Sequence, residues 1–545
     1  MQQPQALFAS LYEAFLASVA DAADLPFLCV PAGREIAPDG QEWTFGETAR
    51  RVEAARRVYA AAGFGRGHRV ALLLGNRPDH FVHLLALNGL GVSQVPVNPD
   101  YRPDELLYLL DHSQADLLVC LPEHLEVAVD AARRARKAPP VIAFSGWGGA
   151  LPAPQAPAAA QPIDLSTEAS LMYTSGTTGR PKACVLSNRH FLNFAQWYID
   201  MGREPRSVVQ LRQRSERLYN PLTVYHVSAG VLCPVSMILL RGCLIMPGRF
   251  SASRWWPEVV QTRATLLHYI GLVPAALMKL PPDPLERAHQ VRWGLGAGIE
   301  PSIHRAFEER FGFPNIEVWG MTEIAGFLAD DIEPRVVGQR AFGRESGDLQ
   351  ARIVDEAGND LPDGTPGRLL VRTTGPDPRY RFFDGYLGDA EATEAAWQGG
   401  WFHTGDVARR DPDGSMYFVD RTKNIIRRSG ENIAAGEIEA VLLASPEVAY
   451  AAAIAVPDAV RQEEVYACIV VQPGVVADAA LARRLFDLCR DKLAYYKAPG
   501  WLHFLDSLPL TATQKVQKAS IFAKGVDPTA LAGVHDFRTL KRQQP

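Results

Sequence analysis

The sequence is 545 residues long, which exceeds the size at which one hydrophobic core keeps growing, so two or more domains are expected. Apolar residues make up 47% and charged residues 21% of the chain, proportions that are ordinary for a soluble globular protein. The formal net charge of -5 argues against a protein that binds nucleic acid through a strong positive field.

The N-terminal residues lack a basic segment followed by an apolar block, so we expect no signal peptide there and predict an amphipathic surface helix. The most apolar stretch, residues 227–240, is interrupted by Pro234 and is shorter than the ~20 apolar residues of a membrane span. The seven cysteines are scattered without a CxxC pair, which is typical of small buried hydrophobic residues in a reducing compartment. We therefore expect a cytoplasmic protein without a transmembrane segment, either a monomer or a homodimer.

Short apolar runs alternate with helical patterns from residue 69 onward. Residues 69–76 are predicted to be a buried strand, 78–92 a helix, 93–99 a strand and 103–120 a helix followed by a strand. Alternation of this kind predicts an α/β fold in layers with largely parallel strands. The Ala- and Pro-rich residues 150–162 are predicted to be an extended surface loop within the same domain, because the α/β rhythm resumes after them.

The pattern changes after residue 420. Residues 436–445 and 477–493 have helical patterns, and residues 448–458 and 463–474 have strand patterns, so they predict a compact α+β unit. We expect a large N-terminal domain of residues 1–420 and a small C-terminal domain of residues 421–545. No internal repeat is visible in the sequence.

Residues 171–187 (LMYTSGTTGRPKACVLS) have the composition of a polyphosphate-binding loop. Glycines allow backbone N–H groups to turn toward an anion, hydroxyl side chains add donors, and a lysine adds a full charge. The residues concerned are Thr174, Ser175, Gly176, Thr177, Thr178, Gly179 and Lys182. The pattern is strand–loop–strand and not a Walker loop, because GxxxxGK[ST] is absent. The alternative interpretation is an ordinary turn rich in Ser, Thr and Gly.

This segment resembles the phosphate loop of the acyl-adenylate-forming superfamily, which includes acyl-CoA synthetases, adenylation domains of peptide synthetases and luciferase-like enzymes. Further motifs follow in the family's order and span nearly the whole chain. They are GAGIEP (296–301), VWGMTEIAG (318–326), HTGD (403–406), DRTKNIIRRSGENI (420–433) and LPLTATQKVQK (508–518). Together with GAGIEP, residues 241–260 most resemble the crotonobetaine/carnitine-CoA-ligase-like branch.

The resemblance implies a nucleotide site. Gly296, Ala297 and Gly298 would lie beside the adenine, and Gly320 and Thr322 belong to the next motif. Trp319 stands where the family usually has Tyr and would stack on the adenine, although a lone Trp is also a common core residue. Glu323 would bind Mg²⁺ together with Thr174, because hard cations prefer oxygen ligands. Asp406 would bind the ribose hydroxyls, and Arg421 the ribose or a phosphate.

The same resemblance implies catalytic and hinge residues. Lys515 would stabilise the charge that develops during adenylation, although Gln514 stands where the family usually has Gly. Lys423 matches the hinge between the domains, and Ser429, Gly430 and Glu431 would face the thiol channel after the C-terminal domain rotates as a lid. His226 matches a gate between the acyl pocket and the thiol tunnel, whereas a His in an apolar stretch is often structural.

The predicted activity is an ATP-dependent ligation of a small-molecule carboxylic acid to coenzyme A through acyl-AMP, with ATP, Mg²⁺ and coenzyme A taking part. Two alternatives stay open: an adenylation enzyme that loads a carrier protein or an amine, and a non-catalytic binding homologue. The basic run at 211–218 could contact the phosphates of coenzyme A, but a solvated loop or helix face is the simpler interpretation.

Overall fold

The structure is a computed structural model that describes residues 7–146, 149–174, 181–345, 347–421, 424–428, 431–458, 461–493, 495–510 and 516–541. The chain divides into two compact units: unit 1 comprises residues 1–350 and 372–402, and unit 2 comprises residues 351–371 and 403–545. The domain boundary expected between residues 420 and 421 separates the N-terminal domain from a C-terminal lid that moves as one body. The division into compact units does not test such a motion, so this boundary stays a prediction.

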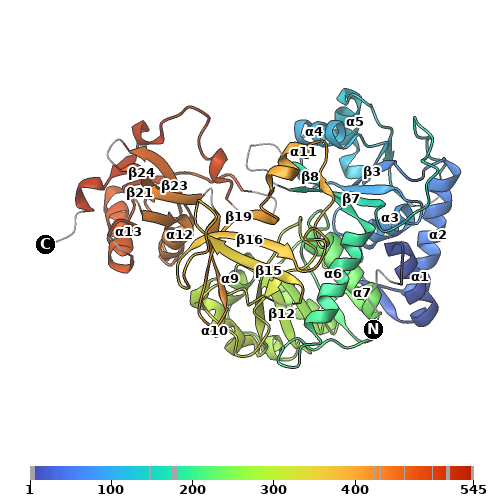
Figure 1. The fold of residues 1–545 in the computed structure, drawn as a ribbon, viewed down its shortest axis with the longest axis horizontal. Coiled ribbons are helices and arrows are strands. Elements are labelled where there is room, and N and C mark those ends of the chain that lie inside the picture. The colour runs from blue at the N-terminus through green and yellow to red at the C-terminus, as the bar shows by residue number, and fades with distance from the viewer. Residues whose placement is uncertain are drawn as a thin grey trace. The chain divides into compact units, whose positions relative to one another are not determined.

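The first sheet of unit 1 has eight strands in the order β14-β13-β12-β11-β9-β10-β1-β2. Its strand β12 is labelled in Figure 1. These strands are β1 (Pro26–Val30), β2 (Gln41–Thr44), β9 (Arg217–Tyr219), β10 (Cys243–Ile245), β11 (Leu266–Ile270), β12 (Trp293–Ala297), β13 (Asn315–Trp319) and β14 (Leu328–Ala329). Neighbouring strands from β13 to β1 are parallel, whereas β14 and β2 pair antiparallel at the two edges. The inner strands are buried runs, as expected for parallel strands covered on both faces.

The second sheet of unit 1 has seven strands in the order β17-β8-β7-β4-β3-β5-β6. These strands are β3 (Arg69–Leu73), β4 (Ser93–Pro96), β5 (Leu117–Cys120), β6 (Val141–Ala143), β7 (Glu168–Thr174), β8 (Lys182–Ser187) and β17 (Gly385–Tyr386). The strands from β7 to β6 are parallel, whereas β8 pairs antiparallel with both β7 and β17. This edge of the sheet therefore brings β17, far along the chain, beside the predicted phosphate-loop segment.

The helices of unit 1 begin where the sequence supplies starting signals. Thr44 and Glu47 form a reciprocal capping box at the start of α2, and prolines occupy the first turns of α3, α4 and α10. The helices are α1 (Leu11–Ala22), α2 (Phe45–Ala61), α3 (Pro78–Asn88), α4 (Pro103–Ser113), α5 (Leu125–Arg134), α6 (Asn188–Met201), α7 (Cys233–Leu240), α8 (Trp255–Gln261), α9 (Leu272–Met278), α10 (Pro301–Phe311) and α11 (Ala390–Ala395).

The chain passes between the units within a third sheet, in the order β15-β16-β19-β18 with β20 beside β19. Its strands are β15 (Leu349–Val354), β16 (Gly367–Thr373), β18 (Trp397–Gln398), β19 (Trp401–Arg410) and β20 (Met416–Arg421). Strands β19 and β20 pair antiparallel, with Asp406 opposite Arg421. This hairpin presents two of the predicted site residues side by side.

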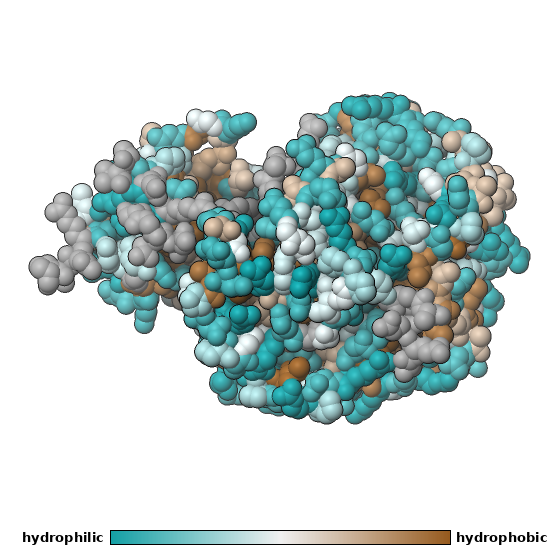
Figure 2. Space-filling view, viewed as in Figure 1, coloured by the Kyte–Doolittle hydropathy of each residue, from teal (hydrophilic) through white to brown (hydrophobic). Residues whose placement is uncertain are grey.

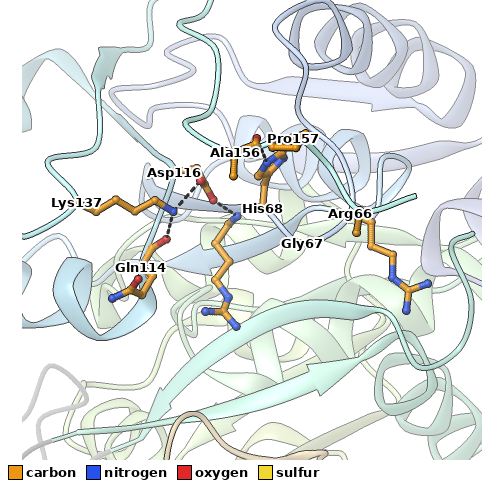
Figure 3. A pocket seen from close by; sticks show the side chains of 10 residues that line it. Arg66, Gly67, His68, Gln114, Asp116, Lys137, Ala156 and Pro157 are labelled. Atoms are coloured by element: carbon orange, nitrogen blue, oxygen red, sulfur yellow. Dashed lines mark hydrogen bonds and ion pairs between the residues drawn. The ribbon is translucent and has the colours of Figure 1, made fainter. Parts of the chain in front are cut away.

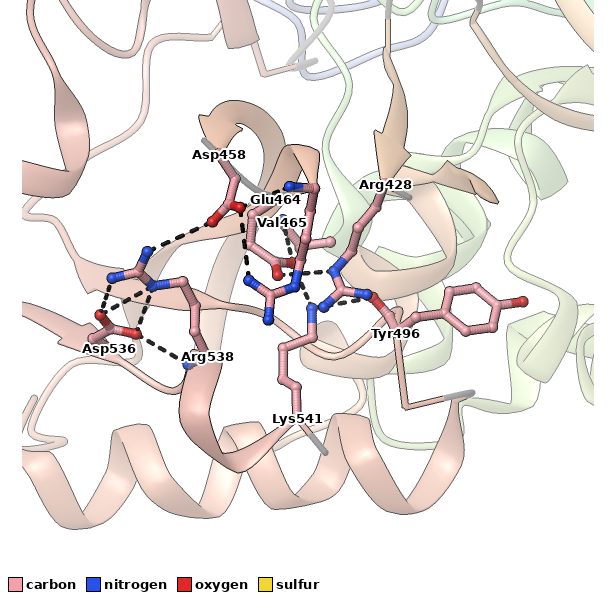
Figure 4. Close-up of polar contacts among 9 residues, drawn as sticks. Arg428, Asp458, Glu464, Val465, Tyr496, Asp536, Arg538 and Lys541 are labelled. Atoms are coloured by element: carbon pink, nitrogen blue, oxygen red, sulfur yellow. Dashed lines mark hydrogen bonds and ion pairs between the residues drawn. The ribbon is translucent and has the colours of Figure 1, made fainter. Parts of the chain in front are cut away.

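The rest of unit 2 is a sheet in the order β22-β21-β24-β25-β26, with β23 beside β24, and two helices. The elements are β21 (Ile425–Arg428), β22 (Glu431–Ala434), β23 (Val448–Asp458), β24 (Gln462–Val471), β25 (Trp501–Phe504), β26 (Val534–Asp536), α12 (Ala435–Leu443) and α13 (Ala479–Lys492). Apolar residues from both helices and the sheet form its core, among them Ile426, Ile438, Val465, Leu485 and Phe486. A group of buried and half-buried charged residues lies beside this core (Figure 4).

The expected α/β class is confirmed, and so are the elements expected from the apolar patterns. The N-terminal segment forms α1, whose buried Leu11, Phe15, Ser18 and Ala22 lie on one face of the helix. Residues 150–162 contain no helix or strand and are largely exposed. All seven cysteines are free and buried, as predicted. Residues 211–216 of the basic run form a largely exposed loop, in which Arg214 pairs with Asp21 at 2.6 Å, and residues 217 and 218 belong to β9.

Among the described residues, every helix is too short or too polar to cross a membrane. On the face drawn in Figure 2, hydrophilic residues predominate and hydrophobic ones lie scattered among them.

Candidate active site

The predicted phosphate loop begins and ends on paired strands. Thr174 at the end of β7 is the ladder partner of Lys182 at the start of β8, and the Thr174 hydroxyl donates to the Lys182 carbonyl at 3.5 Å. The strand–loop–strand interpretation is thus confirmed for the strands. The loop residues Ser175, Gly176, Thr177, Thr178 and Gly179 lie outside the described residues.

The ammonium of Lys182 is held by two groups that the sequence did not single out. Its Nζ lies 3.1 Å from Asp389 Oδ2 and 5.0 Å from the centroid of the Tyr386 ring. Asp389 also caps α11, where its Oδ1 accepts the N–H of Ala392 at 2.9 Å. That N–H and the ammonium of Lys182 lower the pKa of Asp389. Among the described residues, Asp389 and Tyr386 therefore hold the ammonium of Lys182 in a fixed position.

Tyr386 connects this cation to the predicted metal ligand. Its hydroxyl donates to Glu323 Oε1 at 2.8 Å, and its backbone pairs with Cys184 in β8. Glu323 is buried, with 6% of its surface exposed, and its carbonyl accepts the N–H of Phe383 at 2.9 Å. A single phenol thus orients the carboxylate while its ring faces Lys182.

Thr174 and Glu323 approach the same thiol. Burial raises the pKa of Cys184 well above its usual value, the charge of Glu323 raises it further, and a hydrogen bond with Thr174 opposes the rise. The hydroxyl and the carboxylate therefore face one region, although they lie far apart in the sequence. One carboxylate and one hydroxyl fit Mg²⁺, which typically takes one or two protein carboxylates and fills its shell with phosphate oxygens and water. Within the described residues, no group of three or more His, Cys, Asp and Glu could enclose a metal ion without such outside ligands.

The predicted adenine loop begins in β12, whose last two residues are Gly296 and Ala297, and continues past its end at Gly298. A Cβ at Gly296 would collide with the Tyr269 carbonyl, and Gly298 has a φ of +82°, a conformation that favours glycine. Next to this loop, both carboxylate oxygens of Glu317 on β13 accept backbone N–H groups, those of Gly298 and Ile299. Nothing in the sequence indicates a role for Glu317, because a lone acid in a strand pattern carries no signal of its own.

Trp319 lies at the end of β13, at the border of the same region. Only 5% of its surface is exposed, and its ring lies 5.9 Å from that of Phe342 at an angle of 37°. A Cβ at Gly320 would collide with the Phe327 ring, and the Thr322 carbonyl accepts a hydrogen bond from His190 Nε2 at 3.1 Å. The motif is therefore tightly packed, and stacking of adenine on Trp319 stays a prediction.

His226 lies just before a π-helical turn, Ser228–Leu232. Its carbonyl accepts the N–H of Gly230 at 2.8 Å, and its ring lies 4.9 Å from that of Tyr225. The preceding segment is held by Asn76, whose amide donates to the Leu222 carbonyl at 2.9 Å. The half-buried ring is compatible with a gate, and this role stays a prediction.

In unit 2, the predicted ribose ligand and its basic neighbour contact each other. Arg421 Nε lies 2.7 Å from Asp406 Oδ1, and Asp406 is almost fully buried. The Glu431 backbone pairs with Arg428 across the β21–β22 ladder. Lys423, Ser429, Gly430 and Lys515 lie outside the described residues.

A cavity of about 250 Å³ in unit 1 shares no lining residue with the predicted site (Figure 3). It lies beneath the Ala- and Pro-rich loop, where the Ala156 carbonyl bonds to His68 Nε2 at 2.9 Å. Its lining cations already have acidic partners: Lys137 pairs with Asp116 at 2.7 Å and Arg69 with Glu168 at 2.8 Å.

A positioned lysine at the end of a glycine-rich hairpin, a buried carboxylate beside it and a glycine loop on the next sheet define an α/β enzyme that uses a nucleotide. Residues 18–386 match the family model described as AMP-binding enzyme, and residues 437–515 match the AMP-binding enzyme C-terminal domain. The chain belongs to the AMP-binding enzyme family.

Among curated proteins, the chain is 32% identical to a sulfoacetate–CoA ligase from Cupriavidus necator over 91% of this chain and 94% of the relative. It is 27% identical to a crotonobetaine/carnitine–CoA ligase from Proteus mirabilis, over 88% and 92% of the two chains. Its fold matches that of ATP-bound MatB from Rhodopseudomonas palustris with a TM-score of 0.77 at 24% identity, over 93% of this chain and 97% of that chain.

Proposed function

We propose that this protein joins a small-molecule carboxylic acid to coenzyme A in two ATP-dependent steps. The observation that carries the proposal is the linked array of Lys182, Tyr386 and Glu323 at the predicted phosphate loop. It occurs in a chain that is similar over nearly its whole length to proteins named as CoA ligases. A cytoplasmic protein that acts as a monomer or a homodimer is part of the proposal.

In the first step, a carboxylate oxygen of the acid attacks the α-phosphorus of ATP, and the bond to pyrophosphate breaks to give acyl-AMP. Two anions must approach each other, so positively charged residues lower the activation barrier by neutralising their repulsion. Lys182 is proposed to take this role, which its contacts with Asp389 and Tyr386 support, and Lys515 is proposed to join it from the C-terminal domain. A magnesium ion held by Glu323 and Thr174 would supply further positive charge at the phosphates.

The nucleotide is proposed to lie with its adenine at the loop of Gly296, Ala297 and Gly298. Trp319 would contact the base, and Asp406 and Arg421 the ribose. The close packing around Gly320 and the left-handed Gly298 support a rigid wall on this side. A rigid wall favours catalysis because the bound geometry costs no reorganisation when the reaction occurs.

In the second step, the thiol of coenzyme A attacks the acyl carbonyl, the bond to the AMP oxygen breaks, and thioester and AMP form. We propose that residues 421–545 rotate about Lys423 as a lid between the steps. Lys515 would leave the site, and Ser429, Gly430 and Glu431 would approach the thiol. His226 is proposed to gate the path between the acyl pocket and the thiol.

The acid is proposed to be short or medium-sized and aliphatic, cyclic or aromatic. The names of the relatives point to acids with a second charged group, and we place sulfoacetate, crotonobetaine and carnitine first in a substrate panel. Fold and nucleotide motifs do not determine the acid, because substrate pockets vary on one scaffold.

One experiment separates the ligase from its alternatives. The full chain is incubated with Mg·ATP and the acid panel, with and without coenzyme A, and AMP and acyl-CoA are followed by mass spectrometry. The proposal predicts that one acid yields AMP and thioester in equal amounts only when coenzyme A is present. Turnover that ignores coenzyme A but requires a carrier protein or an amine would establish the adenylation alternative. Absence of AMP with every acid would favour a binding homologue.

A further inference from the structure

Asn76 joins loops that leave the two sheets of unit 1 at equivalent positions. Asn76 itself follows the end of β3 in the second sheet by three residues, and Leu222 and Gly248 follow the ends of β9 and β10 in the first sheet by three residues. The Asn76 amide donates to the carbonyl of Leu222 at 2.9 Å and to that of Gly248 at 3.3 Å. Because ligands of α/β sheets bind outside the carboxyl ends of the strands, Asn76 lies at the edge where substrates are expected.

A third hydrogen bond fixes the amide and, through it, the segment 222–224. Oδ1 of Asn76 accepts the N–H of Val224 at 2.9 Å. Two carbonyls need donors and this N–H needs an acceptor, so only one orientation of the amide satisfies all three groups. A cavity of about 10 Å³, which has room for one water molecule, borders Asn76, Leu222 and Val224. Side chains therefore do not fill the space beside the segment, and its position depends on these hydrogen bonds.

The same segment lies against the π-helical turn Ser228–Leu232. A Cβ at Gly230 would collide with the carbonyl of Val224, so the two backbones are in close contact. The carbonyl of Thr223 accepts the N–H of His226 at 3.0 Å, and the carbonyl of His226 accepts that of Gly230 at 2.8 Å. A displacement of the segment would therefore displace His226 as well.

A second asparagine anchors the start of the segment in the core. Oδ1 of Asn220 accepts the N–H of Leu222 at 3.0 Å, and its Nδ2 donates to Cys233 Sγ at 3.3 Å. Cys233 Sγ lies 3.2 Å from His268 Nδ1, and His268 Nε2 lies 3.1 Å from the hydroxyl of Tyr198. Burial lowers the pKa of His268 to about 3, so this buried chain is neutral. The start of the segment is thus fixed from within the first sheet, whereas Asn76 holds it from the second sheet.

We propose that Asn76 is a positioning residue for the thiol step, which it serves by keeping His226 at the path between the acyl pocket and the thiol. This inference rests on the proposed function, in which His226 is the gate. Asn76 touches no reacting atom and acts through the backbone of residues 222–224. Lys182 and Glu323, which are proposed to serve the first step, have their partners in other segments. Loss of the Asn76 amide should therefore slow transfer to the thiol and leave adenylation intact.

The test follows the two half-reactions of the full-length protein separately, with the acid that the substrate panel identifies. Adenylation is measured by exchange of labelled pyrophosphate into ATP, and thioester formation by mixing synthetic acyl-AMP with coenzyme A. Asn76→Ala removes three hydrogen bonds from the segment, so thioester formation is expected to slow about tenfold. Pyrophosphate exchange at saturating acid and ATP should stay within about twofold of the wild type.

A double-mutant cycle shows whether Asn76 acts through His226. If it does, His226→Ala already removes the group that Asn76 positions. The double variant should then form thioester within about twofold of the rate of His226→Ala alone. Independent contributions would instead multiply the two losses in rate. A general loss of stability would not produce this coupling.

Asn188→Ala is the matched control, because Asn188 also joins three segments of unit 1. Its Oδ1 accepts the N–H of Leu11 at 3.3 Å and the side-chain amide of Asn88 at 2.8 Å, and its Nδ2 donates to the Asp164 carbonyl at 3.0 Å. The control therefore loses as many hydrogen bonds as Asn76→Ala. Urea unfolding should show lower stability in both variants, but Asn188→Ala should keep both half-reactions within about twofold of the wild type.

The outcomes separate the proposed function from the role of Asn76. If the wild type forms neither acyl-AMP nor thioester with any acid, the proposed function fails. If the wild type is active but Asn76→Ala slows both half-reactions equally or neither of them, the positioning role is wrong. Losses that multiply in the double-mutant cycle would also overturn it. If Asn76→Ala does not fold, Asn76→Asp decides, because it keeps the acceptor for Val224 and loses both donors. Thioester formation at the wild-type rate in that variant would contradict the inference.

Discussion

Glu317 in unit 1 and Glu464 in unit 2 are both buried, with 6% and 0% of their surfaces exposed, but they bond to different kinds of donor. Glu317 accepts two backbone N–H groups, whereas Glu464 lies between Arg428 Nε at 2.8 Å and the ammonium of Lys541 (Figure 4). Neutral donors leave a carboxyl group that holds its proton up to about neutral pH. The two cations connect β24, which carries Glu464, to β21, which carries Arg428, and to the last described segment, which carries Lys541.

In unit 2 the cations secure the last described segment. Lys541 is 4% exposed. Its ammonium donates to the Tyr496 carbonyl at 3.1 Å and also bonds to Glu464. Upstream of it, Phe537 stacks on Phe486 at 4.7 Å, and Arg538 lies 3.5 Å from Asp458. Burial lowers the pKa of Lys541 to about 8, against the opposing pull of Glu464. One buried carboxylate therefore shapes a loop, whereas the other holds the last described segment, which ends at Lys541, in place.

Removing the acid between the two cations should give the largest effect. Glu464→Gln leaves Arg428 and Lys541 buried without their shared carboxylate, and breaking a buried pair in this way costs about 3–5 kcal/mol of unfolding free energy. Urea unfolding followed by circular dichroism measures it. The control Glu437→Gln removes the half-exposed partner of Lys497 and should cost about 0–1 kcal/mol. Equal losses in the two variants would show that Glu464 does not hold the segment.

Glu317, the carboxylate with neutral donors, should make the unfolding free energy depend on pH. Because the pKa of Glu317 is raised from 4.5 to about 7, the folded protein binds more protons than the unfolded chain between these values. Stability from this group is complete below pH 4.5 and is lost as the pH rises through 7, a change of about 3 kcal/mol. Urea unfolding of the wild type and Glu317→Gln across this range should show the difference between them shift by that amount. A constant difference would contradict the assignment.

Glu323 is a third buried carboxylate, and it accepts a hydrogen bond from the neutral phenol of Tyr386. Tyr386→Phe keeps the ring beside Lys182 but removes the hydroxyl that donates to Glu323 at 2.8 Å. With the carboxylate less well oriented, adenylation should slow about tenfold, which corresponds to roughly 1.4 kcal/mol, and half-saturation should require more Mg²⁺. Pyrophosphate exchange at a series of Mg²⁺ concentrations measures both. Tyr173→Phe, which alters a hydroxyl bonded to His112 at 3.0 Å, should leave the Mg²⁺ dependence unchanged. Equal Mg²⁺ dependence in both variants would refute the orienting role.

The half-buried pair of Lys182 and Asp389 should give the smallest effect. Asp389→Asn keeps the cap on α11 but removes the charge that competes with phosphate for Lys182, so the KM for ATP should fall about two- to threefold. Steady-state kinetics with varied ATP measures the change. Glu394→Gln is the control on the same helix, because Glu394 pairs with Arg379 at 2.8 Å at the surface. A rise in KM for Asp389→Asn would mean that Asp389 supports nucleotide binding.

The sequence alone predicted the structural elements that depend on patterns over a few neighbouring residues. The β7–β8 strands follow from the strand–loop–strand pattern of residues 171–187, the helices α12 and α13 from apolar spacing, and the burial of the cysteines from their scatter without a CxxC pair. The partners of the site residues were not predictable in this way. Lys182 and Asp389 are 207 positions apart, and Glu464 and Lys541 are 77 apart. Only the folded sheets bring such pairs together, and an isolated Tyr, Asp or Glu carries no signal of its partner.

In the proposed mechanism, the acid is activated as an acyl-adenylate before the thiol attacks. It is tested most directly by turning over an acid labelled with oxygen-18 in its carboxylate, once the substrate panel has identified that acid. If the carboxylate attacks the α-phosphorus, AMP retains one labelled oxygen when the thioester forms, and pyrophosphate carries none. AMP should therefore be heavier by one oxygen-18 in proportion to the thioester made. Unlabelled AMP, or label that appears in pyrophosphate or inorganic phosphate, would contradict the account.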